Sequence, residues 1–124
     1  MSQRPEAVIE RFSRLLGEGD LDSMMELYEP EATFAPQPGQ TAAGHEQIRA
    51  ALRGFLAIAP RMEGTVEKVL EAGDTALVAN RWRLTGTTPT GEPVEMAGTS
   101  ADVLRRRDDG SWGILIDDPW GAPA

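Results

Sequence analysis

The 124-residue sequence contains no cysteine and a single histidine. Without thiols there can be no disulfide framework, no thiolate metal site and no cysteine nucleophile. The one histidine, His45, has no second histidine at metal-ligand spacing, so the sequence predicts no metal site. His45 could still act as a base, but its place in the first turn of an expected helix favours an ordinary surface position. We therefore expect chemistry without a metal or other cofactor.

Basic residues are also scarce. Twelve Lys and Arg stand against twenty Asp and Glu, which gives a formal net charge of −8. An acidic chain repels phosphate backbones and anionic lipid headgroups, so neither nucleic acid nor a membrane is an expected partner. The basic run from Arg105 to Arg107 precedes two aspartates and is predicted to be a solvated hairpin end.

Long apolar runs are missing as well. No segment reaches the 18 or so apolar residues of a membrane-spanning helix, and the N-terminal residues lack the apolar block of a signal peptide. We therefore expect a cytoplasmic protein. The composition is that of an ordinary globular chain, with 40% hydrophobic and 26% charged residues. Since domains usually have about 100–150 residues, we expect one domain over residues 1–124.

The first half of the chain has the apolar spacing of about 3.6 residues that is typical of helices. This spacing predicts a first helix over roughly residues 5–17. It predicts a short second helix that Asp20 caps, with Tyr28 on its buried side, and a third over roughly 45–59. The segment Ala32–Phe34 could be an isolated strand between the second and third helices.

The second half has an apolar period of two, which is typical of strands. Glycine-containing turns divide it into four strands, at about residues 62–72, 75–86, 93–107 and 111–119. Gly98 is expected to mark a bulge or bend in the long third strand. Helices followed by hairpins indicate an α+β fold, with three N-terminal helices packed on a curved, mainly antiparallel sheet. Such a cone leaves a cavity at its wide end.

Asp102 is the first candidate for chemistry in that cavity. It shares one strand face with Met96 and Leu104, and if this face lines the cavity, Asp102 is a carboxyl group in an apolar wall. Such a group has a raised pKa and a proton to give to a carbonyl or leaving oxygen. The alternative is a carboxylate that pairs with Arg81 or Arg83 on the neighbouring strand.

The second candidate is one of the adjacent residues Asp117 and Asp118. An extended strand points neighbouring side chains to opposite faces, so only one of them can face the cavity. Alternation counted from Trp112 favours Asp118 as a catalytic candidate. The alternative is that Asp118 only begins a turn before Pro119.

Large apolar side chains supply the expected pocket wall. Trp82 and Trp120 offer rigid rings with an N–H group, which suits a pocket for cyclic ligands, although either could be ordinary core. The same two interpretations apply to the apolar residues of the helices and the first strand. The predicted wall consists of Phe12, Leu16, Phe34, Trp82, Met96, Leu104 and Trp120.

Five segments of the chain, in order, carry the motifs of one known family. Residues 10–22 contain a helix followed by a Gly-Asp-acidic link, residues 28–34 read YEPEATF, and residues 44–49 read GHEQIR. Residues 102–112 contain the pattern D-V-x-R-R before D-G-S-W, and residues 117–121 read DDPWG. Together these segments resemble the nuclear transport factor 2-like superfamily and, within it, the SnoaL-like and ketosteroid isomerase-like branch, including bacterial relatives.

The resemblance implies a cone-shaped fold and a homodimer that forms through the sheet. It also implies an isomerase, a cyclase, a dehydratase or a plain binding protein, since this fold does not settle function. Compared with ketosteroid isomerase, the oxyanion-hole tyrosine falls on Phe12 and the general base falls on or beside Pro36. Only the late-strand acid has a counterpart, at Asp102, so ordinary ketosteroid isomerisation is not expected.

The leading hypothesis is a pocket protein without a cofactor that binds a small apolar, oxygenated molecule. In this hypothesis the protein catalyses an isomerase- or cyclase-type proton transfer with Asp102 as the acid. The missing base and the missing tyrosine motivate the alternative, a non-catalytic ligand-binding or dimerisation module.

Overall fold

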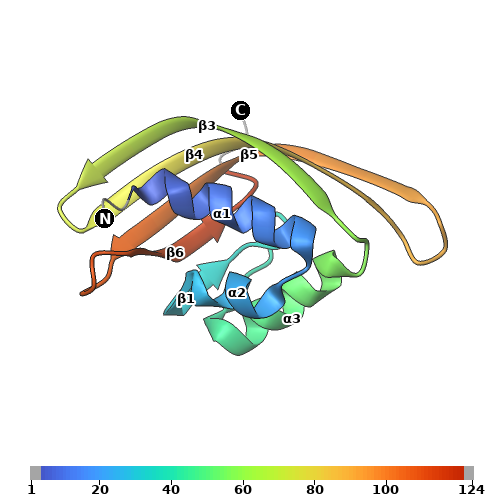
Figure 1. The fold of residues 1–124 in the computed structure, drawn as a ribbon, viewed down its shortest axis with the longest axis horizontal. Coiled ribbons are helices and arrows are strands. Elements are labelled where there is room, and N and C mark those ends of the chain that lie inside the picture. The colour runs from blue at the N-terminus through green and yellow to red at the C-terminus, as the bar shows by residue number, and fades with distance from the viewer. Residues whose placement is uncertain (1–3, 122–124) are drawn as a thin grey trace.

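The computed structural model describes residues 4–121, in which three helices cover one face of a curved six-stranded sheet (Figure 1). The elements are α1 (Pro5–Glu18), α2 (Leu21–Glu26), β1 (Tyr28–Phe34), β2 (Ala42–Ala43), α3 (Gly44–Leu56), β3 (Arg61–Ala72), β4 (Thr75–Thr87), β5 (Pro93–Arg106) and β6 (Trp112–Asp118). The strand order is β2-β1-β6-β5-β4-β3, and only β1 and β6 run parallel. The predicted α+β fold is confirmed. No helix within residues 4–121 is long and apolar enough to cross a membrane.

The link between the first two helices follows the sequence prediction. Gly19 ends α1 with φ of 72°, a left-handed conformation that glycine adopts without strain. Asp20 then caps α2, because its Oδ1 accepts the backbone N–H of Ser23 at 3.1 Å. The predicted first helix and the Asp20 cap are therefore both confirmed.

The second helix is shorter than predicted. It ends at Glu26, and Tyr28 is the first residue of β1 rather than a buried position of the helix. Pro30 lies inside β1, where the ladder with β6 shifts between Tyr28 and Thr33. A proline is tolerated at such an irregularity because it has no N–H to donate. The expected isolated strand at 32–34 is thus the end of a longer strand in the main sheet.

The four predicted hairpin strands are confirmed to within one residue at each end. The predicted bulge or bend at Gly98 is not a bulge, since the β4–β5 ladder runs without a shift along its whole length. Gly98 has a packing role instead. A Cβ atom at this position would lie 3.1 Å from Trp82 Cζ2 and 3.2 Å from the carbonyl oxygen of Pro119.

A bulge in β6 changes which side chains face the helices. Leu104 on β5 pairs with Ile114, whereas the preceding Val103 pairs with Ile116, so Leu115 is an extra residue. A β-bulge of this kind shifts the alternation of the side chains beyond it. Ile114, before the bulge, is buried against the helices, whereas Ile116, after it, is 44% exposed on the outer face.

A buried carboxylate ties the last hairpin to β1. The Glu29 side chain is only 7% exposed and accepts hydrogen bonds from Arg105 Nε at 3.0 Å and from Arg107 Nε at 2.7 Å. Burial opposes the ionisation of Glu29, but the hydrogen bonds from the two arginines outweigh it and lower the pKa of Glu29. The run Arg105 to Arg107 is therefore not simply solvated, because two of its three side chains hold this carboxylate.

Candidate functional site

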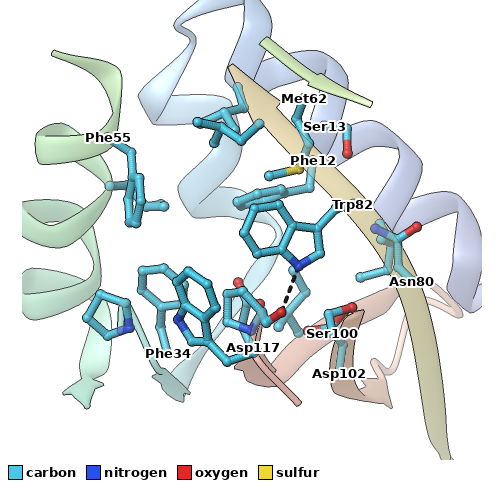
Figure 2. A pocket seen from close by; sticks show the side chains of 18 of the residues that line it. Phe12, Ser13, Phe34, Phe55, Met62, Asn80, Trp82, Ser100, Asp102 and Asp117 are labelled. Carbon is cyan, nitrogen blue, oxygen red and sulfur yellow. Dashed lines mark hydrogen bonds between the residues drawn. The ribbon is translucent and has the colours of Figure 1, made fainter. Parts of the chain in front are cut away.

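An apolar cavity of about 60 Å³ lies between α1, α3 and the inner face of the sheet (Figure 2). This volume holds a few water molecules or the reactive end of a small ligand. Five polar side chains interrupt the apolar wall, from Ser13, Asn80, Ser100, Asp102 and Asp117. Figure 2 shows the last three together on the sheet side of the cavity, with Phe55 of α3 opposite.

The structure brings six of the seven predicted wall residues together around this cavity. They are Phe12, Leu16, Phe34, Trp82, Met96 and Trp120. The prediction for Leu104 is wrong. Leu104 has the inward orientation expected from its strand face, but it lies two residues beyond Asp102 along β5, where it pairs with Ala76 and Ile114 in the closed core.

Asp102 lies in the cavity wall, and its residue surface is 2% exposed. The hydroxyl of Ser100 donates a hydrogen bond to Asp102 Oδ2 at 2.8 Å, while no N–H or O–H group of residues 4–121 donates to Oδ1. The alternative of an arginine partner is wrong. Arg81 and Arg83 form ion pairs with glutamates on the exposed outer face of the sheet.

The second carboxyl group of the cavity belongs to Asp117, and the prediction that Asp118 faces the cavity is wrong. Asp117 is the cross-strand partner of Asp102, and its Oδ2 accepts a hydrogen bond from the Tyr28 hydroxyl at 2.5 Å. Asp118 accepts the backbone N–H of Trp120 in the turn after β6. The cause is the bulge in β6, which shifts the alternation between the start of the strand and its end.

Each of the two cavity carboxyl groups affects the pKa of the other. Burial raises the pKa of Asp102 well above its usual range, and the negative charge of Asp117 raises it further. Burial also raises the pKa of Asp117, against the hydrogen bonds from Asp102 and Tyr28. Two carboxyl groups can share a hydrogen bond only when one of them carries a proton. The pair therefore shares one proton, and the larger rise in the pKa of Asp102 favours its place on Asp102.

Tyr28 completes this cluster from behind Asp117. Burial and the charge of Asp117 raise the pKa of Tyr28 well above its ordinary value, so its hydroxyl remains a neutral donor. Its ring packs edge to face against Phe12 with centroids 6.2 Å apart. Sequence reasoning missed the contact with Asp117 because it assigned Tyr28 to a helix.

Asn80 is a further cavity residue that sequence reasoning missed. It lies opposite Ser100 in the β4–β5 ladder and is buried. Gly64 on β3 leaves room for its amide, since a Cβ atom there would lie 3.0 Å from both Asn80 Nδ2 and Oδ1. The available signal was the alternation in β4, which places Asn80 on the same face as Trp82.

The two cavity tryptophans anchor the turn that follows β6. Trp82 Nε1 donates to the carbonyl oxygen of Pro119 at 2.7 Å, the contact drawn as a dashed line in Figure 2. The rings of Trp82 and Trp120 pack edge to face with centroids 5.4 Å apart. These contacts fix the Trp120 ring in the cavity wall.

His45 lies outside the cavity. Its side chain is exposed, and its Nε2 atom lies 3.0 Å from the backbone oxygen of Tyr28. The surface interpretation of His45 is confirmed. Within residues 4–121, no group of three His, Asp or Glu side chains is arranged to hold a metal ion.

Comparisons with known proteins agree with this fold. The family model described as the SnoaL-like domain matches residues 9–112. A ketosteroid isomerase-like protein from Erwinia carotovora atroseptica is similar in structure, with 20% identity, 90% of this chain and 88% of that chain covered, and a TM-score of 0.79. A conserved protein from Planctomyces limnophilus is also similar in structure, with 19% identity, 96% of this chain and 94% of that chain covered, and a TM-score of 0.83.

A candidate scytalone dehydratase from Novosphingobium aromaticivorans is also similar in structure. The two share 13% identity, the match covers 96% of this chain and 87% of that chain, and the TM-score is 0.80. No curated protein matches the chain in sequence. Identities this low establish a shared backbone fold and leave the chemistry to the side chains of the cavity.

Proposed function

Because the chain belongs to the SnoaL-like domain family, whose fold serves isomerases, dehydratases and non-catalytic members alike, we propose a function from its cavity. The cavity binds a small apolar molecule that carries an oxygen atom, and Asp102 donates a proton to that oxygen. The observation that carries this proposal is the buried carboxyl group of Asp102 in an apolar wall, which has a raised pKa and no N–H or hydroxyl group that donates to Oδ1.

The surroundings of Asp102 suit the transfer of its proton. A carbonyl oxygen that enters the cavity can accept a hydrogen bond from the protonated form of Asp102, and this hydrogen bond is stronger in an apolar site than in water. When the proton leaves, Asp102 becomes negatively charged. The hydrogen bonds that it accepts from the Ser100 hydroxyl and the Asp118 backbone N–H then become stronger. Both donors therefore stabilise the ionised product state.

Asp117 is the base that completes the proposed reaction. In its ionised form it can take a proton from the carbon next to the ligand carbonyl, while Asp102 Oδ1 protonates the carbonyl oxygen. The electron pair of the C–H bond forms the C=C bond of an enol, and the π pair of the C=O bond takes the Asp102 proton. In a ligand with a second, conjugated C=C bond, Asp117 returns its proton to the far carbon while the hydroxyl proton returns to Asp102, which gives an isomer. Asp117 thus replaces the base that the family resemblance would put at or beside Pro36.

A specific observation also favours a second candidate function, a binding protein without turnover. Pro36 lines the cavity at the place where the family resemblance puts the base, and it offers no carboxylate. Ligand binding without proton exchange would support this candidate over catalysis.

Ligand binding is the first test of the proposed function. The probes are acetophenone, its three hydroxy derivatives and cyclohexanone, and the measurement is the thermal unfolding midpoint. A ligand at one hundred times its Kd adds about 2.7 kcal/mol of stability. We expect this shift for at least one ketone in the wild-type protein and in Asp118→Asn, and a smaller one in Asp102→Asn. Equal shifts in both variants, or no shift with any ketone, would contradict the proposed role.

We also propose that the chain pairs with a second copy of itself through the outer face of the sheet. Four apolar side chains form a continuous row there, since Leu70 pairs with Leu77, Leu77 with Val103, and Val103 with Ile116. Leu70, Leu77 and Ile116 are exposed in the single chain. Exposed apolar patches of this kind often mark interaction sites.

The charges around this apolar row are compatible with a copy of the same face. Arg81 and Arg83 lie on the outer face with their partners Glu67 and Glu95. A two-fold axis brings the same patch against itself, and a patch with charges of both signs can place opposite charges together. None of the three helices in residues 4–121 covers this face (Figure 1).

Native mass spectrometry at about 10 μM tests the dimer at a concentration that a micromolar Kd would populate. We expect a dimer for the wild-type chain and a monomer for Leu77→Asp, because a buried unpaired carboxylate opposes association. Thr87→Asp, exposed at the end of β4, is the control and should remain dimeric. A monomeric wild-type chain, or a dimeric Leu77→Asp variant, would contradict the proposed interface.

A further inference from the structure

In residues 4–121 the buried N–H group of Trp120 has no hydrogen-bond acceptor, and buried Asp102 Oδ1 receives no hydrogen bond from an N–H or hydroxyl group. Both residues line the same cavity. Buried polar groups in folded proteins nearly always have a partner, so the unpartnered N–H group calls for an explanation. Its place in the wall of the cavity that also holds the Asp102 carboxyl group indicates that a bound molecule supplies the acceptor.

The Trp120 ring is held in place by contacts that leave its N–H group unused. Its backbone N–H donates to Asp118 Oδ1 at 3.2 Å, and its ring packs edge to face against Trp82. The Trp82 N–H has a structural partner, the carbonyl oxygen of Pro119, whereas the Trp120 N–H has none among the described residues. A donor that is fixed before the ligand arrives loses little freedom on binding.

The chemistry of an indole N–H restricts what can bind to it. This group only donates, so its partner in a ligand must be an acceptor atom. The acceptor that meets Asp102 is already used in the proposed proton transfer. Since the cavity is small, a molecule that fills it can contact both residues at once.

We propose that Trp120 is a specificity-determining residue whose indole N–H donates to a second oxygen of the ligand. The substrate class is therefore small ketones that carry two oxygens, such as hydroxyketones and diketones, in preference to simple ketones. This inference rests on the proposed function, because it assumes that the first oxygen meets Asp102.

A pair of probes and a pair of variants test this inference. The probes are acetophenone, with one oxygen, and its 2-, 3- and 4-hydroxy derivatives, with two. The variants are Trp120→Phe, which removes the N–H but keeps an aromatic ring, and Phe55→Leu, which changes only apolar wall area. Kd values come from isothermal titration calorimetry.

For the wild-type protein we expect at least one hydroxyacetophenone to bind about three- to ten-fold more tightly than acetophenone, the range of one net hydrogen bond. In Trp120→Phe this preference should fall to about one, while in Phe55→Leu it should persist. A preference that survives in Trp120→Phe, or a wild-type protein without any preference, would overturn the inference and leave the proposed function intact. Binding of no probe at all would contradict both.

The indole N–H signals give a readout that does not depend on a variant's folding. The chain has three tryptophans, and each gives one such signal in a proton–nitrogen correlation spectrum. We expect the hydroxyacetophenone that binds most tightly to move the Trp120 signal downfield, and acetophenone to move it less. Equal movement with both probes would count against a hydrogen bond to the second oxygen.

Discussion

Replacing Asp102 with asparagine is expected to slow proton transfer in the cavity by about 10²–10⁴-fold, the usual contribution of one general acid or base. The amide of the variant can donate a hydrogen bond as a protonated carboxyl group does, but it cannot release the proton. The measurement is the rate at which the methyl protons of acetophenone exchange with deuterium from heavy water, followed by proton NMR. This assay needs no knowledge of the natural product.

Asp118→Asn is the matched control for this experiment. Asp118 follows Asp117 directly in the sequence but does not line the cavity. Its side chain caps a turn, which an asparagine can also do. It should exchange at nearly the wild-type rate. Equal rates in the wild-type protein and Asp102→Asn would remove Asp102 from the mechanism, and no exchange above buffer in the wild-type protein would favour the binding candidate.

The Asp102→Asn variant should also change how the stability of the protein depends on pH. Because the folded-state pKa of Asp102 is raised above its usual 3.8, the folded protein binds this proton more tightly than the unfolded chain does. The stability from this group is thus fully present below the unfolded pKa and is lost as pH rises towards the folded pKa, by at most about 1.4 kcal/mol per pH unit.

Urea unfolding of both proteins at several pH values between 4 and 9 measures this loss. The free energy of unfolding of Asp102→Asn should rise relative to wild type as pH increases, because the variant has no carboxyl group to ionise at this position. Curves that stay parallel across the whole range would show that the carboxyl group of Asp102 titrates as it does in the unfolded chain.

The second large effect is expected at Gly113, where Gly113→Ala should lower the free energy of unfolding by about 1–2 kcal/mol. A Cβ atom at this position would overlap Glu29 Oε2 and lie 2.7 Å from Arg107 Nε. The Glu29 carboxylate and the Arg107 guanidinium would both have to shift, which weakens the hydrogen bond between them at a carboxylate that is only 7% exposed. Both side-chain ends are flexible and Arg107 is partly exposed, so the loss stays below that of a broken buried ion pair.

Gly54→Ala is the matched control, because it makes the same chemical change in α3 where no atom lies within 4 Å of the new methyl group. Alanine is the better helix former by about 0.5–1 kcal/mol, so this variant should be slightly more stable than wild type. Urea unfolding at pH 7 compares the two. Similar free energies for both alanine variants would show that the Glu29 ion pairs contribute little.

The elements that could be predicted from the sequence are those with local signals. The α1 helix has an apolar stripe and a terminal glycine, and the hairpin strands have alternation and glycine turns, so their bounds are confirmed almost to the residue. The prediction that Tyr28 belongs to the second helix was wrong, because the local sequence fits a helix end as well as a strand. Its place in β1 depends on pairing with β6, which lies far along the chain.

The site depended more on distant contacts than the elements did. Asp102 and Met96 followed from strand alternation, and the rest of the wall followed from the apolar helix residues and the large rings. The choice between Asp117 and Asp118 depended on a bulge that leaves no mark in the sequence. The arginine run of the last hairpin was interpreted from composition alone. Its partner Glu29 lies 76 and 78 residues away from Arg105 and Arg107, and no local pattern connects them.

The bulge at Leu115 makes the pairing of β6, and not only its side chains, a determinant of the site. If Leu115 were paired in the ladder like its neighbours, the alternation from Trp112 would run unbroken and turn Asp118 towards the ligand in place of Asp117. The loss of the bulge, with every residue retained, would thus exchange the cavity's second acid while both aspartates remain in the gene. Relatives of this chain that pair β6 without a bulge are therefore expected to differ in chemistry even where their acids align.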